Sequence, residues 1–244
     1  MVLITIDKKY EFPTQLNEIT LRQFIAISEK INEKDYDNLV FDLIPVPENV
    51  FFNISLEGRF KIIQLIEILM DGEFLHDQKD IDLNLLIDCP IGQFEDWKAM
   101  IMQQTNKPWN ALQYLCLLEK GEYNYDTRIK DRINVWLDMP ASVALFYQNI
   151  INQEFEDIKN KFLPLFENEV EDIQLEAGIQ TLQQFGGYLT LVNLAGGVYK
   201  DIEMVSKTTV GEAYTFLTYK QIERQYEKNL QKLLSEKSNR NIQD

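Results

Sequence analysis

His76 is the only histidine of the chain, so any metal or nucleophilic chemistry must be built around it. Glu73 and His76 have the Glu-x-x-His spacing of di-iron helix bundles, but those sites need a second such pair and two further glutamates. One histidine cannot supply a second pair. No nucleophile-elbow sequence is present for Ser/His/Asp or Cys/His catalysis either. We predict no metal ligand and no nucleophilic catalytic residue.

Cysteines, aspartates and glycines are the other residue types that could build a site. Cys89 and Cys116 belong to no Cys-x-x-Cys pair, which argues against a disulfide framework and a zinc site. The aspartates between residues 77 and 88 lack the glycine and terminal glutamate of a calcium loop. No phosphate-binding glycine loop occurs, and Gly186-Gly187 and Gly196-Gly197 are typical of a helix kink or packing point and a helix terminator. We predict no cofactor.

Paired carboxylates remain open in an acidic sequence, because such partners meet only in the fold. The run from Glu154 to Glu176 holds eight acids against Lys159 and Lys161, and a solvated helix face is favoured over a partner-facing patch. Our prediction is that the protein is not an enzyme. The alternative is a helical enzyme that uses paired carboxylates, which requires a deep pocket lined by acids of raised pKa.

Composition and charge narrow the range of partners. With 45% hydrophobic and 26% charged residues the chain is typical of a globular protein. Its net charge of −15 argues against specific nucleic-acid binding, which needs clusters of Lys and Arg. The longest apolar stretch, Tyr188 to Ala195, is too short for a membrane span. We expect no membrane association and a reducing cytoplasm as the place of synthesis.

Ten glycines and seven prolines in 244 residues favour helices over a turn-rich β architecture. The chain begins with a predicted β-hairpin from Val2 to Pro13, and Thr20 with Gln23 forms a capping box for the first helix. Alternation from Ile81 to Ile87 predicts one further strand, which could pair with the hairpin. The remaining predicted helices cover 36–44, a core helix after the Ser55 cap, a helix after Pro90, and 111–118, 127–137, 141–162, 170–194 and 210–234.

These elements predict a mainly α protein: a helical, bundle-like body with a small N-terminal hairpin as a minor β component. Composition shifts most sharply around residues 121–126. We therefore predict an N-terminal region of hairpin and helices over 1–120 and an all-helical region over 121–244, with one domain as the alternative.

The last predicted helix has the pattern of a contact surface. Ile222, Tyr226, Leu230, Leu233 and Leu234 recur at helical spacing, and between Lys220 and Arg240 six basic residues outnumber three acids. The rest of the chain is strongly acidic, so this helix could pair with copies of the protein or dock on an acidic neighbour. A solvated face with ordinary Glu and Lys pairs is the simpler interpretation of the charges. We predict the five apolar residues as a partner interface.

Several segments of the sequence form a recognisable pattern. They are residues 4–12, 18–24 and 41–50, which predict a hairpin, a Thr-Leu-capped helix and a Pro-Glu turn, and the later Leu194-Ala195-Gly196-Gly197 and Val210-Gly211-Glu212-Ala213. Together they resemble structural and tail-assembly proteins of tailed bacteriophages. The resemblance implies a non-enzymatic role in building the virion, with no catalytic residues.

From this resemblance we expect a virion structural protein of the tail or head-to-tail connector region, made in the bacterial host cytoplasm. Its expected partners are copies of itself and other virion proteins. A tail-assembly chaperone that is absent from the mature virion is the alternative. An acidic lumen would suit the structural role, because like charge keeps passing DNA from adhering to the wall.

Overall fold

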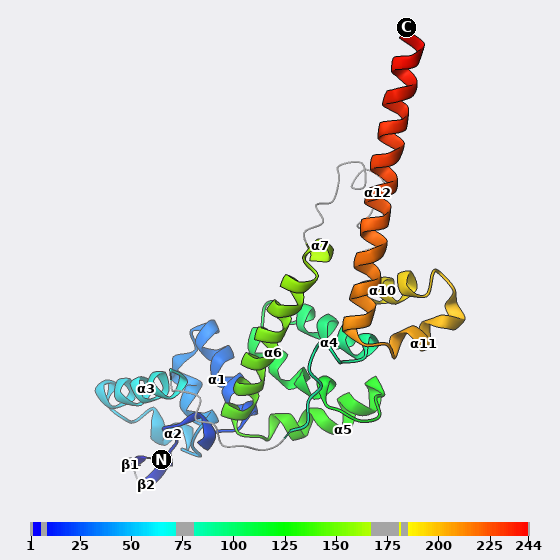
Figure 1. The fold of residues 1–244 in the computed structure, drawn as a ribbon. Coiled ribbons are helices and arrows are strands. Elements are labelled where there is room, and N and C mark those ends of the chain that lie inside the picture. Colours follow the sequence, from blue (N-terminus) through cyan, green and yellow to red (C-terminus); the bar gives the residue numbers. More distant parts are fainter. Residues whose placement is uncertain (1, 6–8, 72–80, 167–180, 182–184, 244) are drawn as a thin grey trace. The chain divides into compact units, whose positions relative to one another are not determined.

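The computed structural model describes residues 2–5, 9–71, 81–166, 181 and 185–243, and it is mainly helical with a two-stranded antiparallel hairpin at the N-terminus (Figure 1). This confirms the predicted fold class. The elements are β1 Val2–Thr5, β2 Lys9–Phe12, η1 Leu16–Glu18, α1 Leu21–Glu33, η2 Tyr36–Asp42, α2 Glu48–Phe51, α3 Leu56–Met70, α4 Ile91–Gln103, η3 Pro108–Leu118, α5 Tyr125–Leu137, α6 Ala141–Lys161, α7 Leu163–Phe166, α10 Gly187–Leu194, η4 Tyr199–Asp201, α11 Ile202–Ser206 and α12 Val210–Gln243.

Helix ends follow the capping residues of the sequence. Thr20 and Gln23 form the predicted capping box at the start of α1, and the Ser55 hydroxyl accepts a hydrogen bond from the Gly58 N–H at the start of α3. Gly196 and Gly197, both with positive φ, follow the end of α10, as predicted for a helix terminator. Sequence alone therefore located these ends.

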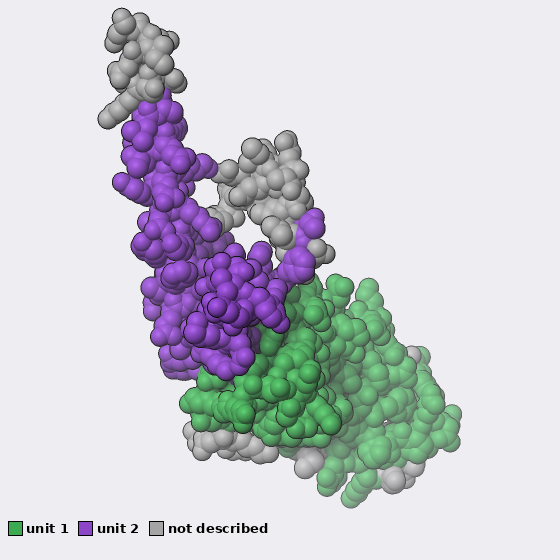
Figure 2. Space-filling view, turned by 90° about the vertical axis from the view of Figure 1, so that its right-hand side faces the viewer, with its two compact units in different colours: residues 1–84, 96–152 green, residues 85–95, 153–244 purple. Residues whose placement is uncertain are grey.

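The chain divides into two compact units, shown in green and purple in Figure 2. The first comprises residues 1–84 and 96–152, and the second comprises 85–95 and 153–244. Helices α4 and α6 each continue from one unit into the other. Each unit is therefore built from segments distant in sequence, whereas a division at residues 120 and 121 falls inside the first unit.

Each unit contains a pair of helices whose first residues are joined by an antiparallel bridge. In the first unit Leu21 N–H donates to the Met139 carbonyl at 2.7 Å, and Ala141 N–H donates to the Ile19 carbonyl at 2.8 Å. This arrangement joins the starts of α1 and α6 through the Thr20 and Pro140 bridge.

The second unit repeats this bridge between α4 and α12. Ile91 N–H donates to the Thr208 carbonyl at 2.8 Å, and Val210 N–H donates to the Cys89 carbonyl at 2.9 Å. The residue after each bridged position is fully buried in all four helices: Leu21, Ala141, Ile91 and Val210. The start of α1 is thus joined to α6 in the first unit in the same way as the start of α4 is joined to α12 in the second.

Two expectations about local structure are wrong. Residues 81–87 form no strand; Leu83 makes a single bridge to Glu119, with Asn84 N–H bonded to the Leu118 carbonyl. Helix α3 is not wholly core, since it buries Ile62, Ile66 and Leu69 but exposes Leu56, Phe60 and Ile68. In both places the local pattern predicts a covered segment, but the described structure has few neighbouring elements that could pair with it or pack on it.

Candidate partner interface

The first turns of α12 are part of the core of the second unit. Val210, Ala213 and Tyr214 are buried, and the Tyr214 ring makes edge contacts with Phe162 and Phe94 at centroid distances of 5.6 and 6.1 Å. Burial raises the pKa of the Tyr214 phenol, and the charge of Glu95 raises it further. The first turns of α12 are thus held in the core by aromatic packing.

Beyond this base the helix leaves the core. Every side chain from Arg224 to Glu236 is exposed. Seven of the exposed residues on α12 are nevertheless large and apolar: Phe216, Tyr219, Ile222, Tyr226, Leu230, Leu233 and Leu234. We call these seven residues the α12 stripe. It contains all five residues that the sequence predicted as an interface, and adds Phe216 and Tyr219, which have the same helical spacing.

The α12 stripe lies on one side of the helix. At 3.6 residues per turn its seven members fall within an arc of about 120°, and the buried Val210, Ala213 and Tyr214 lie on the opposite side. A contiguous apolar surface of this kind on an exposed helix is typical of an interaction site, whereas single exposed apolar residues are ordinary. The core-facing side and the stripe therefore belong to two different contacts.

A single charged group lies within this arc between Phe216 and Leu234. Glu223 accepts a hydrogen bond from the Tyr219 hydroxyl at 2.9 Å and from Lys220 Nζ at 2.7 Å. The Lys220 ammonium lowers the pKa of the Glu223 carboxyl. The charge of Glu223 is thus balanced by Lys220 of the same helix, so the carboxylate does not prevent contact between the stripe and an apolar partner.

The equivalent helix of the first unit shows how such a face is covered. Tyr147 has the same place after its bridge in α6 as Phe216 has in α12. Tyr147 is half-buried: its ring meets Trp136 of α5 at 6.1 Å, and its hydroxyl donates to the Ile81 carbonyl at 3.1 Å. Phe216 remains 44% exposed, and the element before its bridge, α11, has only five residues against thirteen in α5. The second unit thus leaves open a surface that the first unit covers.

A buried charge cluster in the first unit was not predicted from the sequence. Glu119, at the end of η3, accepts hydrogen bonds from Arg128 Nη1 at 3.1 Å, Arg132 Nε at 2.7 Å and Trp136 Nε1 at 2.7 Å. Arg128, Arg132 and Trp136 recur every four residues on one face of α5, a signal that was present in the sequence. All partners of the carboxylate come from the chain, so the cluster fastens α5 to η3.

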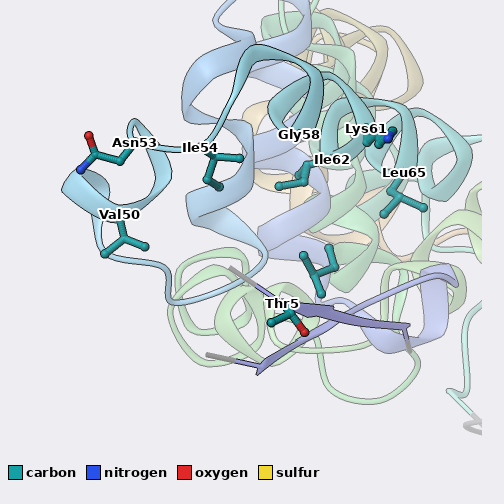
Figure 3. A pocket seen from close by; sticks show the side chains of 9 residues that line it. Thr5, Val50, Asn53, Ile54, Gly58, Lys61, Ile62 and Leu65 are labelled. Atoms are coloured by element: carbon teal, nitrogen blue, oxygen red, sulfur yellow. The ribbon is translucent and has the colours of Figure 1, made fainter. Parts of the chain in front are cut away.

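An open groove lies between the hairpin and helices α2 and α3 (Figure 3). It has a volume of about 570 Å³ and is lined mainly by apolar side chains, among them Ile4, Val50, Ile54 and Leu65. Among the described residues of its lining, Lys61 alone is charged. These residues give the groove the surface of a packing site, with no pair of carboxylates among them.

Two carboxylates do line a smaller pocket of about 260 Å³ in the second unit, together with Leu85, Ile87 and Ile158. Glu154 Oε2 accepts a hydrogen bond from the Leu86 N–H at 2.7 Å, and Lys161 lies in the same lining as Asp157. Glu154 therefore caps the backbone of the segment before α4. If the protein were an enzyme that uses paired carboxylates, Glu154 and Asp157 of this pocket would be the candidate pair.

Some of the acids and the histidine that were candidates for a metal site are not among the described residues. Glu73, His76, Asp77 and Asp80 lie outside the described residues, as do the acids from Glu167 to Glu176. Both cysteines are buried, and burial raises the pKa of each thiol to about 12. Across the described ranges, no group of three or more His, Cys, Asp or Glu residues is arranged to hold a metal ion. In those same ranges no helix has the length and apolarity needed to cross a bilayer.

Comparison with known proteins adds no assignment: no protein-family model, curated protein or solved structure matches the chain.

Proposed function

We propose that this protein is a non-enzymatic structural protein of the virion of a tailed bacteriophage, in the tail or the head-to-tail connector region. It acts through helix-mediated contacts with copies of itself and with other virion proteins. The observation that carries the proposal is the α12 stripe, an apolar surface on a helix whose core contacts are on the opposite side. The phage-like segments of the sequence supply the virion context.

The strong negative charge supports this context. With a net charge of −15 the protein repels nucleic acid, which suits a wall along which DNA passes. The proposal includes no cofactor, no metal, no specific nucleic-acid binding and no membrane association.

A tail-assembly chaperone is the second candidate, and the same stripe favours it. An apolar helix face that is open in the isolated chain can cover apolar surface on another virion component during assembly. The two candidates differ in whether the protein remains in the finished particle.

Quantitative mass spectrometry of purified particles and of the infected-cell lysate distinguishes them. Peptides of this protein at a fixed ratio to the major tail protein in density-purified particles support the structural role. Peptides that are abundant in the lysate and absent from the particles overturn that role and favour the chaperone. Treating particles with nuclease before purification controls for protein carried by released DNA.

A further inference from the structure

We infer that α12 pairs antiparallel with α12 of a second copy of this chain, about a two-fold axis at Tyr226. The inference rests on the proposed function in one respect, because it takes self-contact as the purpose of the α12 stripe. It adds the partner, the direction and the register.

The spacing of the stripe is the first argument. Tyr219, Ile222, Tyr226, Leu230 and Leu233 follow one another in steps of three, four, four and three residues, a sequence of steps that reads the same in both directions. In a two-fold interface, residue i contacts residue j of the partner and j contacts i. Antiparallel pairing centred on Tyr226 therefore places Tyr219 opposite Leu233 and Ile222 opposite Leu230, so the five central residues of the stripe oppose one another. Phe216 and Leu234 lie at the edges of this contact, opposite Glu236 and Thr218.

The bounds of α12 agree with this register. Because α12 runs from Val210 to Gln243, antiparallel pairing centred on Tyr226 places the first turn of each helix beside the last turn of the other. A helix carries a partial positive charge at its N-terminus and a partial negative charge at its C-terminus, so this direction brings opposite helix ends together, whereas a parallel pair brings like ends together.

The exposed apolar area is sufficient for a stable pair. Tyr219, Ile222, Tyr226, Leu230 and Leu233 are 56, 59, 65, 40 and 56% exposed. Because a tyrosine side chain buries about 200 Å² and leucine or isoleucine somewhat less, burying these five contributes on the order of 500 Å² per copy and ~1,000 Å² per pair. Specific interfaces begin near this area, and Phe216, Leu234 and the flanking residues add to it.

Directional cross-linking of the full chain tests the inference. Two variants, Ile222→Cys and Leu230→Cys, are co-expressed on chains of different mass and oxidised. Residues 222 and 230 of opposing copies meet in the antiparallel register, whereas two copies of residue 222 are about 12 Å apart along the axis. We expect a mixed disulfide dimer and no cross-link from either variant alone. Cys89 and Cys116 are buried and give no background.

A matched control uses Arg224→Cys with Lys228→Cys. These positions have the same midpoint at Tyr226 and are also exposed, but they lie on the other side of the helix. Cross-linking of the control pair to the same extent would mean random collision and would overturn the inference. Self-cross-linking of Ile222→Cys would mean a parallel pair and would overturn it as well.

The mass in solution gives an independent measurement. Light scattering of the wild-type chain is expected to give twice the mass of one chain, and Leu230→Asp with Leu233→Asp is expected to give one chain at unchanged helical circular dichroism. A wild-type monomer at every concentration, or a double variant that stays dimeric, overturns the inference. If the double variant loses its helical signal, the cross-linking decides, because it introduces no charge. Absence from virions would overturn the structural role without changing either solution result.

Discussion

Removing the Glu119 carboxylate tests whether the buried cluster fastens α5 to η3. In Glu119→Ala the Arg128 guanidinium loses its carboxylate partner while its side chain is only 10% exposed. Trp136, fully buried, loses the acceptor of its indole N–H at 2.7 Å. Arg128 keeps its bonds to the backbone carbonyls of Lys120 and Glu122, so part of its hydrogen bonding remains.

The expected magnitude follows from burial. Removing one partner of a buried ion pair costs about 3–5 kcal/mol, because an uncompensated charge is left behind. Glu119→Gln retains an acceptor for Trp136, but it places an NH2 donor where Oε2 accepts from Arg128 Nη1 and Arg132 Nε, so we expect a loss in the same range. Arg132 is 39% exposed, and Arg132→Ala should cost about 1 kcal/mol because solvent screens the pair.

Urea unfolding followed by tryptophan fluorescence measures these losses of stability in the first unit, where the cluster lies. Trp97, Trp109 and Trp136 are the three tryptophans of the chain, and all belong to the first unit. Glu122→Ala is the matched control, since that side chain is exposed and only its backbone carbonyl binds Arg128. If Glu119→Ala lowered the free energy of unfolding no more than Glu122→Ala does, the cluster would not be what fastens α5 to η3.

Three further predictions concern burial and close packing. Burial raises the pKa of Asp96, although Tyr123 donates a hydrogen bond to its carboxylate. The folded protein therefore holds the proton more tightly than the unfolded chain does, and the stability of the fold falls as pH rises above the ordinary pKa of 3.8. Asp96→Asn should raise the thermal midpoint at pH 7 and not at pH 3.5, and equal shifts at both would refute this. Cys89 and Cys116, whose thiol pKa values are raised to about 12, should resist iodoacetamide at pH 8 until urea unfolds the chain, and rapid labelling of the native protein would contradict their burial. Gly92→Ala should lower stability by about 1–3 kcal/mol, because a Cβ there would lie 2.9 Å from Ser206 Cβ; an unchanged midpoint in calorimetry would show that this contact yields easily.

The sequence by itself determined the class of fold and the ends of several helices. Capping depends on one or two side chains within a single turn, so Thr20 with Gln23 and Ser55 could be identified without tertiary information. The helical spacing of Ile222, Tyr226 and Leu230 is likewise local. Its periodicity shows that these residues share one side of a helix, though not what that side faces.

Only the tertiary structure decided which surfaces are covered. The alternation from Ile81 to Ile87 is typical of a strand, but a strand needs a partner along its length, and only Leu83 finds one, at Glu119. The division into units also depends on contacts between residues more than a hundred positions apart, such as the bridges of Thr20 with Pro140 and Pro90 with Thr209. Exposure of the α12 stripe is a property of the same kind, because it is set by the absence of covering elements on that side of the described second unit, which spacing in one sequence does not encode.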